Sequence, residues 1–374
     1  MSRKIVKPDY ANSILSVIGS INKNFGYNYT LTNNKLNEII EKHQYDHVIL
    51  MLLDGLGTKV LNNNLGKKCF LQKQKIADLI AIYPSTTACA TISTISGKEP
   101  IETGWIGWEN YFCEIDKNVV LFNNTDYFTG EKLDFNCFDN LPYSKFFDNY
   151  NFYHDEIYPP FGKNPCQNFD EILDKTVQLN NQSDKTFLYV YWTEPDYSIH
   201  EYTSKHSKIK KMLVEMNDKI EEFTKKLTQN TLLIIVADHG HTNVKPIYLK
   251  KDKVLLSYLE RMPANEGRCC TFKVKNGKHK GFVYHFNKKY GHDFKLYSKT
   301  DFTENGMLGN KNKVKNPRLD DFLGDYIACG ISNKYFDYAT EDVCNNQFVF
   351  KSHHAGLTEN EMLIPLIVYK KGEE

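Results

Sequence analysis

The chain has 374 residues, of which 41% are hydrophobic and 25% charged, so it can bury a sizeable core in one elaborated domain or in two. Its 47 basic residues balance 46 acidic ones, which argues against the single-sign field of proteins that bind nucleic acid or a membrane surface. The sequence therefore predicts a folded protein, and neither a nucleic acid nor a membrane as a partner.

The N-terminal stretch and the cysteines indicate where in the cell the protein is expected. Met1 to Tyr10 is polar and lacks the apolar segment of a secretion signal, and no stretch approaches the length of a membrane span. The cysteine count is nine, an odd number, and no CxxC spacing occurs. This pattern favours reduced thiols over a disulfide framework or a cysteine zinc site. We expect a cytoplasmic protein.

Three apolar runs that lead into carboxylates predict the strands of a buried sheet. The runs and their acids are His47 to Leu53 with Asp54, Thr186 to Trp192 with Glu194 and Asp196, and Leu232 to Ala237 with Asp238. Continuous apolar runs of this length are typical of parallel strands that are covered on both faces. Between the last two, Ser204 to Leu227 has apolar residues at helical spacing. The alternation predicts an α/β fold with ligands beyond the carboxyl ends of the strands.

Two stretches break this alternation. Gly104 to Gln167 is rich in aromatic residues and asparagine, and we expect a loop-heavy elaboration there. Residues 246–318 contain a strand-like run from Cys270 to Lys275, a turn at Asn276-Gly277 and an amphipathic stretch from Gly281 to Tyr290. The expected organisation is one catalytic domain over residues 1–374 with a small α+β cap inserted at 246–318.

Carboxylates and imidazoles gather where the apolar runs end. Asp196 and His200 are four residues apart, so a helical turn places both on one face, and Asp238 is followed directly by His239. Asp54 and His354 add a further carboxylate and imidazole. Each alone reads equally well as a turn, a helix cap or a hydrogen-bonded loop residue. Taken together, they are the mixture of oxygen and nitrogen ligands that zinc or manganese accepts.

A hydroxyl-rich segment lies between the first two of these sites. Tyr83-Pro84-Ser85-Thr86-Thr87 is followed by small residues up to Gly97, as expected of a tightly packed helix whose N-terminus approaches an anion. A plain N-cap explains the segment equally well on its own. For Thr86 we expect no more than such a backbone cap.

The order of these motifs resembles a known family. Asp54, the Pro-Ser-Thr-Thr run, Glu194-Pro195-Asp196 with His200, Ala237-Asp238-His239-Gly240, and His354 two residues before Gly356 are similar to the type I phosphodiesterase and nucleotide pyrophosphatase branch of the alkaline phosphatase superfamily. The resemblance covers roughly residues 46–110, 186–245 and 350–369. It implies a three-layer α/β sandwich with a mostly parallel central sheet.

The resemblance also implies a site and a chemistry. One metal ion would be held by Asp54, Asp238, His239 and Thr87, and the other by Asp196, His200 and His354. Thr87 would be the nucleophile, forming a phosphothreonine intermediate, with two zinc ions expected and manganese as the alternative. The implied activity is hydrolysis of phosphodiester or pyrophosphate bonds in small nucleotide-like substrates. A phosphonoacetate hydrolase or phosphomonoesterase on the same site, and a non-catalytic binding protein, are the alternatives.

The sequence departs from the family it resembles at one substrate-binding position. The resemblance implies an asparagine three residues after the nucleophile as a donor to a phosphoryl oxygen, but this position is Ala90 here, so the donor must come from elsewhere, such as the Thr87 amide or Asn110. Trp108 and Tyr111 could stack on a base. Only four arginines occur, and Arg268 and Arg318, in or beside the cap, are the candidates for a phosphate contact. Each could equally be a surface residue, and Arg268 is the one that we expect to bind phosphate.

Overall fold

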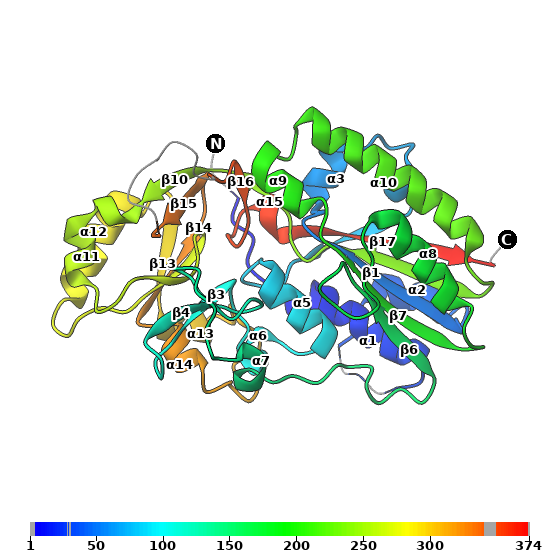
Figure 1. Cartoon of the computed structure of the whole chain (residues 1–374), viewed down its shortest axis with the longest axis horizontal. Coiled ribbons are helices and arrows are strands. Elements are labelled where there is room, and N and C mark those ends of the chain that lie inside the picture. The colour runs from blue at the N-terminus through cyan, green and yellow to red at the C-terminus, as the bar shows by residue number, and fades with distance from the viewer. Residues whose placement is uncertain (1–3, 28, 30, 340–348, 373–374) are drawn as a thin grey trace. The chain divides into compact units, whose positions relative to one another are not determined.

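The computed structural model describes residues 4–27, 29, 31–339 and 349–372 (Figure 1). The chain divides into two compact units. The parallel-sheet unit comprises Asp9–Ala81, Ser144–His241 and Leu363–Glu374, and the antiparallel-sheet unit comprises Met1–Pro8, Ile82–Tyr143 and Thr242–Met362. Among the described residues, no helix combines the length and the apolar character needed to cross a membrane.

The parallel-sheet unit is built on six strands in the order β2-β17-β8-β1-β7-β6. Their bounds are β1 His47–Leu53, β2 Lys75–Ile80, β6 Tyr153–Ile157, β7 Thr186–Trp192, β8 Thr231–Val236 and β17 Leu363–Lys371. β8, β1, β7 and β6 run parallel, whereas β17 is antiparallel to both of its neighbours. Every residue of β1 and β8 is buried, as the continuous apolar runs predicted.

Helices lie on both sides of this sheet, with α10 on one side and α1 on the other (Figure 1). The helices of this unit are η1 Tyr10–Asn12, α1 Ile14–Asn24, α2 Asn34–Ile40, α3 Thr58–Asn64, α4 Phe70–Lys73, α8 Phe169–Asn180, α9 Asp196–Tyr202 and α10 Ser207–Lys226. α10 packs against α8 and α3 and buries the five apolar residues that predicted it: Ile209, Leu213, Met216, Ile220 and Phe223. The α/β prediction is confirmed.

A seven-stranded antiparallel sheet, in the order β13-β14-β12-β11-β3-β4-β5, forms the centre of the other unit. Its strands are β3 Glu109–Phe112, β4 Lys117–Val120, β5 Thr125–Asp126, β11 Ala264–Glu266, β12 Cys269–Phe272, β13 Phe294–Ser298 and β14 Tyr326–Gly330. Two short pairs accompany it: β9 Thr242–Asn243 with β16 Ser352–His353, and β10 Lys245–Tyr248 with β15 Lys334–Asp337. The helices are α5 Thr87–Ser96, α6 Pro100–Thr103, α7 Cys137–Asn140, η2 Leu249–Lys251, α11 Lys253–Tyr258, α12 His279–Tyr290, α13 Lys299–Glu304, α14 Leu319–Phe322 and α15 Glu359–Met362.

The sheet contains three strands that the sequence did not predict. β3, β4 and β5 come from the stretch Gly104 to Gln167, which was expected to be loop-heavy and has no helix or strand over most of its length. The strands are only two to four residues long and bury polar side chains such as Asn110 and Asn118, so they show no alternating pattern. β14 also lies beyond the expected cap at 246–318, whose boundaries stay a prediction.

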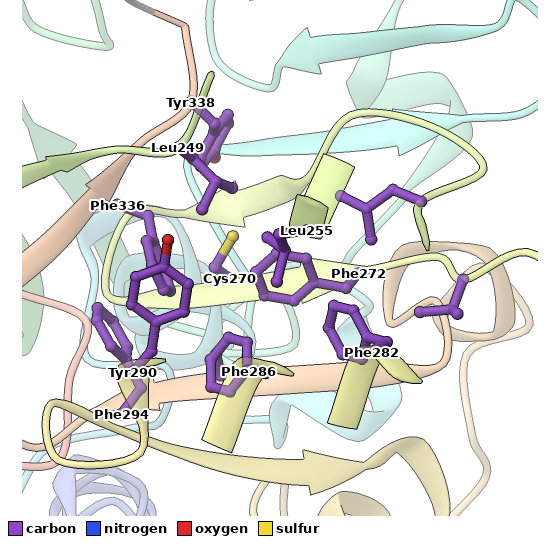
Figure 2. Packing of buried hydrophobic residues seen from close by; sticks show 13 residues of the cluster. Leu249, Leu255, Cys270, Phe272, Phe282, Phe286, Tyr290, Phe294, Phe336 and Tyr338 are labelled. Carbon is purple, nitrogen blue, oxygen red and sulfur yellow. The ribbon is translucent and has the colours of Figure 1, made fainter. Parts of the chain in front are cut away.

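The core of the antiparallel-sheet unit packs α11 and α12 against one face of the sheet. Figure 2 shows Phe282, Phe286 and Tyr290 of α12 directed toward Phe272 and Cys270 of β12. Aromatic contacts continue to Phe294 and Phe336, whose rings are stacked with their centroids 4.1 Å apart. This explains why the amphipathic stretch in the sequence forms a helix here.

One buried carboxylate fastens α12 to the start of α11. Asp252, the N-cap of α11, accepts hydrogen bonds from the Leu255 amide at 3.0 Å, His285 Nε2 at 2.8 Å, Lys289 Nζ at 2.9 Å and the Tyr290 hydroxyl at 2.7 Å. Burial alone raises the pKa of Asp252, but the bonds from His285, Leu255, Lys289 and Tyr290 outweigh it and hold that pKa well below its usual value.

Asp252→Asn should therefore lower the free energy of unfolding by about 1–3 kcal/mol, because the donors around it lose their charged acceptor. The pKa of Asp252 is lower in the folded state than in the unfolded one, so the stability it contributes is complete above the unfolded value, about 4. It disappears as the pH falls through the folded value. Urea unfolding at pH 7 and at pH 3 measures both effects. Asp301→Asn, at an exposed position in α13, is the control and should change stability by less than about 0.5 kcal/mol.

Candidate active site

The ends of three adjacent strands bring three carboxylates together in the parallel-sheet unit. Leu53 pairs with Trp192, and Leu52 with Val236, so β1, β7 and β8 end at the same edge of the sheet. Backbone hydrogen bonds continue past the strands, from the Asp54 amide to the Trp192 carbonyl at 2.9 Å and from the Asp196 amide to the Asp54 carbonyl at 3.0 Å. Asp54, Asp196 and Asp238 therefore lie at one edge, as the spacing predicted.

A glycine makes this close approach possible. Gly55 follows Asp54 with φ +71°, and its amide donates to Asp238 Oδ1 at 3.0 Å. A Cβ at this position would lie 2.8 Å from the Asp196 Cα and 3.0 Å from His241 Nε2. Both the left-handed conformation and the crowding require glycine here.

Asp54, Asp238 and His239 form one candidate metal cluster. His239 Nε2 lies 3.5 Å from Asp54 Oδ1 and 3.5 Å from Asp238 Oδ2. Zinc ligands about 2.0–2.2 Å from a tetrahedral ion are roughly 3.3–3.6 Å from one another, so these spacings suit such an ion. Within the described residues, Asp238 Oδ2 is buried and accepts no hydrogen bond. The donor set fits a divalent metal ion.

A second cluster shares this edge of the sheet. Asp196, His239 and His241 form it. Asp196 Oδ1 lies 3.4 Å from His200 Nε2, in the i, i+4 arrangement that the sequence predicted on α9, and 2.5 Å from His241 Nε2. The parallel-sheet unit thus gathers five of the seven predicted metal ligands: Asp54, Asp196, His200, Asp238 and His239.

The electrostatics of these clusters favour a bound cation. Burial, followed by the charges of Asp238 and Asp196, raises the pKa of Asp54 well above its usual value, although the Tyr191 hydroxyl donates a hydrogen bond to its carboxylate. Burial lowers the pKa of His241 to about 4, so its imidazole is neutral at pH 7. A divalent cation would offset the repulsion between the carboxylates.

The predicted nucleophile lies in the antiparallel-sheet unit. Thr87 is the first residue of α5, and its side chain is half-buried at the N-terminus of this ten-residue helix. The preceding Thr86 corrects an expectation: it is the N-cap residue, but its side chain makes no capping bond. Its hydroxyl instead donates to Glu266 Oε1 at 2.6 Å, and the same oxygen accepts the Trp108 amide at 2.8 Å. Glu266 thereby ties the start of α5 to the start of β3.

His354, the remaining predicted ligand, belongs to the same unit as Thr87. The Ala355 amide donates to the Ser85 carbonyl at 2.8 Å, and the Ser85 hydroxyl donates to the Gly356 carbonyl at 3.0 Å. These bonds hold the segment that contains His354 beside the segment that leads to Thr87. Both residues thus come from adjoining loops of one unit.

The predicted substrate-binding residues near β3 do not share one surface. Asn110 and Tyr111 are neighbours in β3 and so point to opposite faces of the sheet. Asn110 is fully buried, and in the described part of the chain neither atom of its amide group has a hydrogen-bond partner. Tyr111 stacks under the guanidinium of Arg261 at 3.8 Å. Trp108 is 39% exposed.

Arg268 is held inside the antiparallel-sheet unit. Its fully buried guanidinium donates to both carboxylate oxygens of Glu361, at 2.6 and 2.7 Å, and to the Lys334 carbonyl. Glu361 also accepts the Gly356 amide at 2.7 Å, and a Cβ on Gly356 would lie 2.6 Å from Arg268 Nη2. The ion pair therefore fixes the loop that follows His354, and the phosphate contact expected of Arg268 stays a prediction.

Two residues of this region, Glu266 and Glu361, were not identified from the sequence. The contact of His241 with Asp196 was not predicted either. The sequence did offer an indication for His241, because it is a second histidine two residues after the predicted ligand His239. The two glutamates had none, because a single Glu in an apolar or loop segment does not indicate its partner.

Arg268→Ala should lower the free energy of unfolding by about 3–5 kcal/mol, because it leaves Glu361 buried without its cation. Urea unfolding without substrate measures this. Arg318→Ala is the control: its partner Glu114 is partly exposed, so the cost should stay near 1 kcal/mol or below. An Arg268→Ala protein of wild-type stability with a raised KM would instead identify Arg268 as a substrate-binding residue.

Comparisons with known proteins agree with this geometry. The family model described as type I phosphodiesterase / nucleotide pyrophosphatase matches residues 48–336. A comparison with curated proteins gave no match.

Several solved structures are similar to the chain. Murine ectonucleotide pyrophosphatase / phosphodiesterase 5 is 15% identical, with a TM-score of 0.63 over 87% of this chain and 90% of that one. The human protein is 14% identical, with a TM-score of 0.60 over 87% and 89%. Phosphonoacetate hydrolase from Sinorhizobium meliloti 1021 is 13% identical, with a TM-score of 0.61 over 88% and 92%.

At these identities the likeness shows the fold alone, and it confirms the alkaline-phosphatase-like architecture that the motifs implied. The family match extends over most of the chain and includes Asp54, Thr87, Asp196, His200, Asp238 and His239. The chain belongs to the type I phosphodiesterase / nucleotide pyrophosphatase family.

Proposed function

We propose that the protein is a two-metal hydrolase that cleaves phosphodiester or pyrophosphate bonds of small nucleotide-like substrates. One observation carries this proposal: His239 Nε2 lies 3.5 Å from an oxygen of each of two buried carboxylates at the strand ends. This is about the distance between two ligands of one tetrahedral zinc ion. Family membership supports the reaction class of phosphoester hydrolysis.

The seven candidate ligands divide between two ions. Asp54, Asp238 and His239, with the Thr87 hydroxyl, would hold one, and Asp196, His200 and His354 the other. Two divalent ions, zinc with manganese as the alternative, would supply Lewis acidity and would lower the pKa of the Thr87 hydroxyl.

The chain's own residues carry the covalent steps. Thr87 Oγ1 gives its proton to solvent and attacks phosphorus, so a Thr87 Oγ1–P bond forms as the bond from phosphorus to the leaving oxygen breaks, and solvent protonates the leaving oxygen as needed. A water oxygen then attacks phosphorus, the Thr87 Oγ1–P bond breaks, and Oγ1 takes up a proton from the water, which regenerates the Thr87 hydroxyl. The positive end of the α5 dipole favours the negative charge that develops at this residue. The unpartnered amide of Asn110 is our candidate donor to a phosphoryl oxygen.

Aromatic side chains support a nucleotide-like leaving group. In the parallel-sheet unit, Phe161 is 69% exposed and lies 6.2 Å from the ring of Tyr191, which donates to Asp54. In the other unit, Trp108 is partly exposed. Either ring could stack on a base. An inactive variant of the murine relative has been solved in complex with AMP, which favours the same substrate class.

Phosphonoacetate hydrolysis is the second candidate, because a phosphonoacetate hydrolase has the same fold. Turnover of metal-loaded protein on bis-p-nitrophenyl phosphate, p-nitrophenyl phosphate, nucleotide phenyl esters and phosphonoacetate separates the candidates. The proposal predicts that the diesters are the best substrates. A preference for phosphonoacetate would contradict it.

Metal removal should abolish turnover and lower the melting temperature, because the buried carboxylates then repel one another. At a metal concentration about 100 times the Kd, binding adds about 2.7 kcal/mol to stability. Protein treated with a chelator and dialysed should regain activity on addition of Zn²⁺ or Mn²⁺. Full turnover by dialysed protein shown to contain no metal would refute the two-metal assignment.

Thr87→Ala should reduce diester turnover by on the order of 10³-fold or more, because the group that forms the covalent intermediate is gone. Its metal content should stay largely intact, since Asp54, Asp238 and His239 remain. Thr87→Ser should keep substantial activity. Thr91→Ala is the matched control, because its hydroxyl lies one turn along α5 and bonds only the Thr87 carbonyl among the bonds described. A fully active Thr87→Ala enzyme would mean that water attacks phosphorus directly.

A further inference from the structure

His241 is a buried histidine to which the proposed mechanism gives no role. It follows β8 in the turn Asp238-His239-Gly240-His241, and its side chain is fully buried. Its Nε2 lies 2.5 Å from Asp196 Oδ1, closer than His200 Nε2, which lies 3.4 Å from the same oxygen. The bond connects the turn after β8 to the first residue of α9.

The surroundings of His241 are built for this contact. Its ring is in contact with two imidazoles that are candidate ligands, with centroids 4.9 Å from His200 and 5.5 Å from His239. Gly55 leaves the space beside it, because any side chain there would press on both His241 and Asp196. The position of the ring is therefore fixed from several sides.

The chemistry of the pair determines which partner carries the proton. An ionised carboxylate only accepts hydrogen bonds, so a contact this short requires the hydrogen on His241 Nε2. A protonated ring nitrogen cannot bind a metal through the same atom. Asp196, in contrast, keeps further lone pairs for an ion.

We infer that His241 is a positioning residue for the metal site of Asp196 and His200: its Nε2–H holds the Asp196 carboxylate in the orientation that binds the ion. The inference rests on the proposed two-metal function. Hydrogen bonds of this kind to ligand carboxylates typically account for 10–100-fold in metal affinity.

A pair of polar substitutions that differ in reach tests the inference. The amide of His241→Gln can occupy roughly the place of Nε2 and donate to Asp196, whereas that of His241→Asn is too short. The dissociation constants of both Zn²⁺ ions are measured by competition with a chromophoric chelator, and the bound metal is counted in each protein. His241→Asn should weaken one of the two ions by about 10–100-fold and leave the other unchanged, whereas His241→Gln should stay within a few-fold of wild type.

His47→Ala is the matched control. His47 is also buried in this unit, at the first residue of β1, and bonds Thr186 Oγ1 at 3.0 Å, far along the strand from Asp54. Its loss should lower the melting temperature and leave both metal affinities unchanged. The comparison separates a defect in the metal site from a general loss of stability.

The outcomes are distinguishable. Wild-type affinity for both ions in folded His241→Asn would overturn the positioning role. Equal losses in His241→Gln and His241→Asn would overturn it as well and identify the imidazole as a direct ligand. Wild-type protein that binds neither Zn²⁺ nor Mn²⁺ would refute the proposed function itself, whatever the variants do.

Discussion

The parallel register of β8, β1 and β7 is the constraint on which the candidate site depends. Because of this register, three neighbouring strands finish at the same end of the sheet, where Asp54, Asp196 and Asp238 follow them. Backbone hydrogen bonds link Asp54 to Trp192 and to Asp196 there. Burial, and after it the charges of Asp238 and Asp196, raises the pKa of Asp54 well above its usual value. The register that builds the core of the sheet therefore also places acids at the carboxyl ends of its strands, where a bound cation would stabilise them.

Buried acids also organise the antiparallel-sheet unit. Glu266 accepts hydrogen bonds from the Thr86 hydroxyl and the Trp108 amide, and Glu361 accepts them from the guanidinium of Arg268 and the Gly356 amide. Both therefore hold segments that lead to candidate site residues, Thr87 and His354. Asp54 and Asp238 also accept hydrogen bonds, from the Tyr191 hydroxyl and the Gly55 amide, but Asp54 lies beside other carboxylates whose charges add to the effect of burial on its pKa.

Sequence patterns predicted the parts of the molecule in which the spacing of apolar residues, or a motif, reflects how the residues are buried. The runs that form β1, β7 and β8 are apolar because those strands are covered on both faces, and the acids that follow them could be recognised as candidate ligands because they end such apolar runs. β3, β4 and β5 were missed because strands this short and this polar leave no period. The ion pair of Arg268 could not be predicted, because its partner, Glu361, is 93 residues away and no sequence pattern links the two.

The order of strands has a consequence for synthesis on the ribosome. β17 lies inside the sheet, between β2 and β8, although it follows every other strand of that sheet in the chain. Until residues 363–371 emerge, β8 and β2 each present an unpaired edge, and the sheet exists only as separate pieces. Nascent chains should therefore depend on chaperones over most of translation, and truncation before β17 should yield insoluble protein rather than a smaller folded enzyme.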